Sequence, residues 1–193
     1  MRPLKTSLLI IALVVAPLAF TGVGRADDET VVRWDVVSID FVAGTVNAGG
    51  NASAKANDGS MITVTGSGTF GTSAGNDDVT GGGTWQISSP AGSGTYQVTR
   101  LVRFDVAPGT FPPLTDNIGN AADGHAGLAV LSVRYSDGSH GILVVSCHFN
   151  GTPNSVFEGI TASKGFVDYW NRVPPAPGVD ANRTAFHVVK GDD

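Results

Sequence analysis

The chain has 193 residues, 26 of them glycine, and only 15% are charged, with 12 basic and 17 acidic side chains. A formal charge of −5 argues against nucleic acid or an anionic membrane surface as a partner, because both need clustered Lys and Arg. The single cysteine, Cys147, excludes an intramolecular disulfide.

The first 26 residues have the layout of a secretory signal peptide. Two basic residues precede a nearly unbroken apolar run over 7–20, and Gly24 and Ala26 place small residues at the −3 and −1 positions of a cleavage site. The run is shorter than a bilayer span of about 20 residues, which favours cleavage over an uncleaved anchor. We therefore predict a secreted single domain over 27–193, with nine basic and 17 acidic residues, a formal charge of −8 and no membrane segment.

Short runs of β-branched and aromatic residues between Gly, Asn, Asp and Ser clusters indicate an all-β domain. The first strand is expected over 29–42, where apolar residues occupy both parities, which indicates a bend, a bulge or a change of sheet. A loop rich in glycine and asparagine over 43–60 and a strand over 61–70 follow.

A Gly-x-Gly-Thr-aromatic motif occurs three times, at 66–70, 81–85 and 92–96. This pattern is typical of successive hairpin strands whose aromatic residues anchor a core, and no Lys-Ser/Thr follows to support a phosphate-binding loop. The motifs resemble those of small secreted barrels such as the lipocalin-like and dirigent-like proteins. That resemblance implies a barrel and carries no particular function.

The segment 94–106 alternates like a half-buried strand. One parity is interrupted only by Arg100, and we expect its apolar members to face the core: Tyr96, Val98, Val102, Phe104 and Val106. The next loop, 107–124, contains three prolines, and loops of this length are often functional or mobile.

The stretch 126–149 predicts two long strands joined at 136–138. A two-residue turn would pair Tyr135 with His140, whereas a three-residue loop with Gly138 in a G1 bulge would pair Arg134 with His140. We favour the three-residue loop, because it gathers apolar side chains on one face: Ala129, Leu131, Val133, Tyr135, Leu143, Val145, Cys147 and Phe149. The middle of the mixed opposite face is expected to be covered by another sheet, a loop or a second subunit.

Two short strands over 155–170, a proline-rich loop over 172–182 and a last strand over 184–189 complete the chain. The last strand is expected to close the sheet beside an early or central strand, since a hydrophobic edge invites aggregation. A total of about eight strands predicts a small antiparallel β-barrel, with a two-sheet β-sandwich as the alternative.

No catalytic residue is predicted and no cofactor is indicated. Cys147 and His148 point to opposite faces of a strand, so they cannot act together, and Cys147 is interpreted as a small buried side chain. Glu29 and Glu158 are the only glutamates, and neither has an obvious partner for paired-carboxylate chemistry.

Two candidate binding sites remain, beside the ordinary alternatives of core packing and surface pairing. Basic and aromatic side chains on neighbouring strands suit an acidic, apolar or sugar ligand; the residues are Trp85, Tyr96, Arg100, Arg134 and His140. A second hypothesis is a metal site formed by Asp123, His125 and His148, because the loop before one strand lies near the end of its partner.

The leading interpretation is a secreted, non-enzymatic barrel domain that binds a small ligand or a protein partner. One alternative is a small secreted barrel enzyme that assists isomerisation or cyclisation. The other is a surface or matrix protein that forms a homo-oligomer through the mixed face of the hairpin.

Overall fold

The computed structural model describes residues 30–72 and 78–190, so the predicted signal peptide lies outside the described residues. These ranges contain strands and one short 3₁₀ helix and no α-helix, which confirms the all-β prediction. Among the described residues, none of the helical structure has the length and apolar character of a membrane span.

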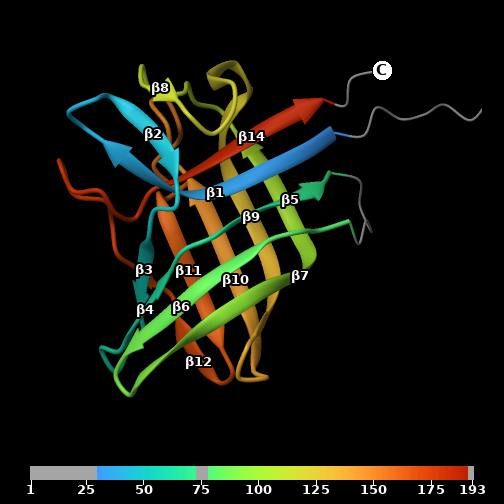
Figure 1. Ribbon diagram of the computed structural model, residues 1–193, viewed down its shortest axis with the longest axis vertical. Helices are drawn as coiled ribbons and strands as arrows, with labels where there is room; N and C mark the ends of the chain where they lie inside the picture. Colours follow the sequence, from blue (N-terminus) through green and yellow to red (C-terminus); the bar gives the residue numbers. More distant parts are fainter. Residues whose placement is uncertain (1–29, 73–77, 191–193) are drawn as a thin grey trace, which may run out of the picture.

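Six strands close into an antiparallel barrel (Figure 1). In ring order they are β1 (Thr30–Asp40), β5 (Ser67–Gly71), β6 (Gly82–Ser88), β7 (Ala91–Ala107), β9 (Gly124–Tyr135) and β14 (Thr184–Lys190). The last strand, β14, lies between β1 and β9 and closes the ring as predicted. The barrel is therefore confirmed over the sandwich, with six strands in the ring and the others attached to it.

The attached strands extend the barrel wall on two sides. From β9 the wall continues through β10 (His140–Cys147), β11 (Gly159–Lys164) and β12 (Val167–Tyr169). From β6 it continues through β4 (Met61–Val64), β3 (Ala52–Lys55) and β13 (Asn171–Arg172). Because these strands extend the wall without joining the ring, the sequence predicts more strands than the six that close the barrel.

The segment 43–60 is not the loop that its composition predicts. It contains β3 and also β2 (Thr45–Ala48), which pairs with the end of β1 and, in parallel, with the two-residue β8 (Thr115–Asp116). The 3₁₀ helix η1 (Ala121–Asp123) follows β8. Small side chains form a strand here because β3 pairs with β4 and Ala52 and Ala54 are fully buried in the core.

The strand β1 changes partners along its length, as its mixed pattern predicts. Up to Val36 it pairs with β14 and β5, whereas its last four residues pair with β2. Trp34 and Val36 belong to the main core, and Val37 and Ile39 belong to a second apolar cluster on the outer face of the wall. Both faces of β1 are therefore buried in the middle of the strand, from Trp34 to Val37.

The β9–β10 hairpin has the predicted three-residue loop. Arg134 pairs with His140, and Gly138 adopts a left-handed φ of 87°, as a G1 bulge requires. Every side chain predicted for the core face is buried, from Ala129 to Phe149. On the opposite face Ile142 and Val144 stay half-buried in a shallow depression beside Trp170.

The long strand β7 departs from its predicted alternation at two bulges. Its register against β9 shifts between Val98 and Arg100 and again between Leu101 and Arg103. Because an extra residue turns the following side chain to the other face, Leu101 packs against the core and Val102 is 50% exposed. Val106, near the rim, is 55% exposed, so the predicted burial of these two valines is wrong.

The glycines of the repeated motif lie where strands approach closely. A Cβ on Gly83 would lie 2.0 Å from the Thr65 carbonyl oxygen, and one on Gly68 would lie 2.2 Å from the Thr80 carbonyl oxygen. The aromatic residue of each motif is buried, as predicted: Phe70, Trp85 and Tyr96.

Large side chains fill the barrel interior. The Phe104 ring, for example, lies 5.1 Å from Phe70 and 5.2 Å from Phe186, centre to centre. The second cluster lies outside the wall, where the segment 108–119, here termed the strap, crosses β1, β2 and β14; its members are Val37, Ile39, Val46 and Ala185, with Phe111, Leu114 and Ile118. The candidate site opens at the edge of this second cluster.

Candidate functional site

Trp85 and Tyr96, two of the predicted ligand-binding residues, are buried in the barrel core. Trp85 Nε1 donates to the Thr95 carbonyl at 3.1 Å, and the Tyr96 hydroxyl donates to the Thr65 carbonyl at 2.8 Å. Because the backbone satisfies their polar atoms, both side chains serve the packing of the core.

The predicted cations lie on the outside of the same wall. Arg134 and His140 are exposed and face each other across β9 and β10, and Arg100 is exposed opposite Ser132. Arg134 and Tyr96 border one shallow depression. The depression that Arg134 and Tyr96 border is not lined by Trp85, Arg100 or His140.

Lys164 covers the core at the end of the barrel that carries the β9–β10 loop, here termed the hairpin end. Its Nζ lies 4.3 Å from the ring centre of Trp85 and 5.1 Å from that of Tyr135, donates to Ser139 Oγ at 3.0 Å, and forms an ion pair with Asp137. The hydrogen bonds from Lys164 and Ser139 lower the pKa of Asp137 to about 2. The ammonium group thus has both aromatic and acidic partners.

The predicted metal ligands are not brought together. Asp123 ends η1, His125 pairs with Phe186 across β9 and β14, and His148 follows β10. Across 30–72 and 78–190, no group of three or more His, Cys, Asp or Glu side chains is placed to hold a metal ion. His148 instead lines the pocket that opens beside the strap.

This pocket has a volume of about 160 Å³ and lies between the end of β10, the start of β14 and the strap. Its wall is largely apolar and is formed by Val37, Ile39, Val46, Phe111, Pro112, Phe149 and Ala185. Its polar end is formed by His148, Asn150, Glu158, Arg183 and Thr184. Protein cavities of about 150 Å³ can hold a benzene ring, so the volume suits a molecule of that size.

Glu158 occupies the centre of the polar end. Its Oε1 accepts the Thr184 backbone N–H at 2.6 Å, and its Oε2 accepts the His148 backbone N–H at 2.5 Å. Burial raises the pKa of Glu158 to about 8, although these hydrogen bonds and the nearby Arg183 act in the opposite direction. At neutral pH the carboxyl group is therefore mainly protonated and is itself a hydrogen-bond donor.

His148 has a defined tautomer in its neutral form. Its Nδ1 lies 2.8 Å from the Val156 carbonyl oxygen, which only accepts hydrogen bonds, so Nδ1 carries the proton. Nε2 is then left as an acceptor. The pocket lining thus includes both the Glu158 carboxyl group and His148.

Arg183 brings a guanidinium group to the pocket. Its Nη2 lies 3.5 Å from the Ala176 carbonyl oxygen, and the group lies over the Phe41 ring at 5.4 Å. In the part of the chain that the structure describes, Arg183 Nε is buried without a hydrogen-bond partner and Arg183 forms no ion pair. Its charge is therefore not neutralised by a carboxylate.

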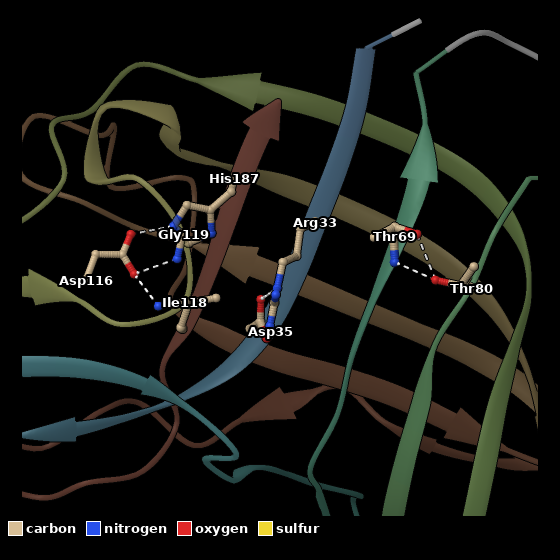
Figure 2. Close-up of polar contacts among 8 residues, drawn as sticks. All are labelled: Arg33, Asp35, Thr69, Thr80, Asp116, Ile118, Gly119 and His187. Atoms are coloured by element: carbon tan, nitrogen blue, oxygen red, sulfur yellow. Dashed lines mark hydrogen bonds and ion pairs between the residues drawn. The ribbon is translucent and has the colours of Figure 1, made fainter. Parts of the chain in front are cut away.

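A buried contact between Asp116 of the strap and His187 of β14 holds the strap against the barrel (Figure 2). Asp116 Oδ2 lies 2.7 Å from His187 Nε2, with both side chains 2% exposed, and Asp116 Oδ1 accepts the Ile118 and Gly119 backbone N–H groups at 2.9 and 3.2 Å. Burial raises the pKa of Asp116, but the hydrogen bonds outweigh it and the net shift is downward. On the neighbouring β1, Arg33 donates two hydrogen bonds to Asp35.

Phe111 connects this contact to the pocket. Its ring lies 6.2 Å from the His187 ring and 5.3 Å from the Phe149 ring, and it forms part of the pocket wall. The strap therefore forms part of the pocket wall through Phe111. It also covers the buried His187 Nδ1, which has no hydrogen-bond partner in the described residues.

Sequence reasoning missed Glu158, Arg183 and Phe111. The available signal was a single glutamate inside the half-apolar run 156–162, where an acidic side chain has few ways to reach water. Comparison of the chain with known protein families, curated proteins and solved structures finds no match. Functional inference therefore depends on the chemistry of the pocket.

Proposed function

We propose that the protein is a secreted ligand-binding barrel domain and that it holds a small, largely apolar molecule in the pocket beside Glu158. The observation that carries this proposal is a cavity of about 160 Å³ whose lining is largely apolar and also includes the hydrogen-bonded group of His148, Glu158 and Thr184. The apolar wall would bury the body of the ligand, and the polar end would fix its orientation.

Ligand-observed NMR with benzyl alcohol, a benzene-sized probe, tests this proposal. Asn150→Trp places a large side chain at the exposed rim of the pocket and is expected to abolish saturation transfer to the probe. Asn154→Trp is the matched control, because Asn154 is exposed in the same turn without lining the pocket. Equal saturation transfer in both variants would place any binding elsewhere and reject the proposal.

A second candidate is a proton-transfer enzyme of the isomerase or cyclase type. It is favoured by one observation, a carboxyl group with a pKa of about 8 in a pocket that His148 also lines. The test is exchange of the α-protons of a small ketone, such as acetophenone, in D₂O. A rate equal to that of buffer alone would reject catalysis and leave ligand binding in place.

The proposal includes export of the chain, which is supported by the layout of residues 1–26. Expression of the full chain in a bacterial host, followed by N-terminal sequencing of the exported protein, tests it. We expect the sequence to start at Asp27. A protein retained in the cytoplasm with its first residues intact would contradict this part of the proposal.

A further inference from the structure

We infer that the ligand of the pocket carries a carboxylate group and that Arg183 is the residue that recognises it. This inference rests on the proposed function, because it assigns a chemical class to the molecule that the pocket holds. Arg183 lines the same cavity as the apolar residues, at the polar end. A small molecule with an apolar body and one carboxylate matches both parts.

The first argument is the unused capacity of the guanidinium group. Arg183 lies one residue before β14, and the one hydrogen bond that its side chain makes to the described residues is a long one, at 3.5 Å to the Ala176 carbonyl oxygen. Its flat face lies over Phe41, and no acidic side chain in the described ranges comes within ion-pair distance. A guanidinium fork binds a planar carboxylate through two parallel hydrogen bonds, so a carboxylate is the natural counter-ion.

The second argument is that Glu158 does not take this role. Both of its oxygens are engaged by the backbone N–H groups of His148 and Thr184 rather than by Arg183. Since its pKa is raised to about 8, the carboxyl group is mainly neutral at pH 7 and does not repel an anion.

The third argument is the contrast with the other arginines on the barrel surface. Arg134 and Arg100 are exposed and border no apolar cavity that matches the pocket wall. In water such a charge binds a carboxylate weakly, because solvent screens it. Beside an apolar wall the same charge is less screened, so Arg183 is the better carboxylate site of the described chain.

Calorimetric titration with benzoate and benzamide tests the inference, because the two probes have nearly the same shape and differ in charge. For the unaltered protein at pH 7 we expect benzoate to bind about 10- to 100-fold more tightly, as is typical of a hydrogen-bonded charge. Arg183→Gln is expected to remove this preference, and Arg183→Lys to restore part of it. Arg134→Gln is the control and should leave the preference unchanged.

The outcomes separate this inference from the proposed function. If both probes bind equally, or if Arg134→Gln rather than Arg183→Gln removes the preference, the carboxylate assignment is overturned and pocket binding stands. If neither probe binds the unaltered protein, the proposed function fails and the inference fails with it. Circular dichroism of each variant identifies any that do not fold, and Arg183→Lys then carries the test.

The pH dependence gives a second measurement on the unaltered protein. The ionisable groups that face Glu158 are Cys147 and His148 at the end of β10 and Arg183 before β14. Because burial and Glu158 raise the pKa of the Cys147 thiol well above its usual value, the thiol stays neutral in this range. As pH rises through about 8, the negative charge of ionised Glu158 repels a bound anion, so benzoate affinity should fall while benzamide affinity stays constant.

Discussion

The two ends of the barrel use charge in opposite ways. At the hairpin end Lys164 has an acidic partner, Asp137, and two aromatic rings beneath it. At the opposite end, where the strap and the pocket lie and which is here termed the strap end, Arg183 and Glu158 are not fully exposed to water. Within the described residues neither forms an ion pair. A charged side chain that already has a protein partner is satisfied, whereas a charged side chain that lines an apolar cavity without a partner remains available to a ligand.

The sequence directs attention to the hairpin end as the candidate binding site, whereas the unpaired charged group that lines a pocket lies at the strap end. Trp85 and Tyr96 are among the more conspicuous residues in the sequence, yet the backbone satisfies their polar atoms, and the conspicuous basic residues Arg100, Arg134 and His140 are exposed. Within the described residues three buried side-chain atoms lack a hydrogen-bond partner: Trp34 Nε1 in the main core, and Arg183 Nε and His187 Nδ1 near the strap. Unsatisfied groups of this kind are costly, so the two near the strap direct attention to the strap end.

The largest expected effect comes from removing an aromatic anchor at the hairpin end. Trp85→Ala should cost about 3–5 kcal/mol of unfolding free energy, because it leaves a cavity beneath Lys164. Urea denaturation measures this loss. Trp170→Ala is the control, since Trp170 is 63% exposed, and should change stability by about 0.5 kcal/mol or less. A small loss of unfolding free energy in Trp85→Ala, together with a changed affinity for benzoate, would contradict this structural role and indicate a ligand site at the hairpin end.

Asp116→Asn should loosen the strap by weakening its contact with His187. We expect a loss of about 1–3 kcal/mol, felt mainly as faster amide hydrogen exchange over 108–119. Exchange measured by mass spectrometry separates this from global unfolding. Asp137→Asn, at the hairpin end, should leave strap exchange unchanged. Equal acceleration in β9 and β10 would contradict a local role for Asp116.

Glu158 gives the strap end a pH-dependent contribution to stability. Its folded pKa of about 8 lies above its unfolded value, so the folded state retains a proton that the unfolded state has lost. The contribution is therefore fully present below about pH 4.3 and falls by up to about 1.4 kcal/mol per pH unit until about pH 8.

Urea denaturation between pH 5 and 9 measures this slope, and Glu158→Gln should remove it. At the hairpin end the lowered pKa of Asp137 has the opposite sign, since its contribution is lost only as pH falls toward about 2. Retention of the slope in Glu158→Gln would assign it to another group and would weaken the contrast between the ends.

The smallest expected effect is that of the ammonium group at the hairpin end. Lys164→Met removes the ion pair and the cation–π contact while it keeps the side-chain length, so we expect a loss of about 1 kcal/mol. Lys55→Met, at an exposed position, is the control. Urea denaturation at low and high salt checks the result, and a change in benzoate affinity would contradict a purely structural role.

Local rules predicted the hairpin correctly, because turn chemistry and the requirement for one apolar face select the same register at Gly138. They failed for Val102, because a β-bulge depends on how β7 must curve against β9, which alternation does not record. The loop prediction over 43–60 failed because pairing with β4 and β8 overrode composition.

The pocket could not be predicted in the same way, because it is assembled from distant parts of the chain. Val46, Phe111, Glu158 and Arg183 come from four separate segments and meet only when the strap crosses β1 and β14. The raised pKa of Glu158 is a property of that assembly, since burial is its largest cause. A glutamate judged by its neighbours in sequence therefore looked ordinary.

The close approach at Gly68 and Gly83 also limits how this sequence can diverge. At these positions any side chain would meet a backbone carbonyl oxygen at 2.2 or 2.0 Å, so substitution requires the strands to separate. In distant descendants of this chain, we expect the spacing of the glycines to outlast overall sequence identity, which makes that spacing a better query for finding them than the pocket itself.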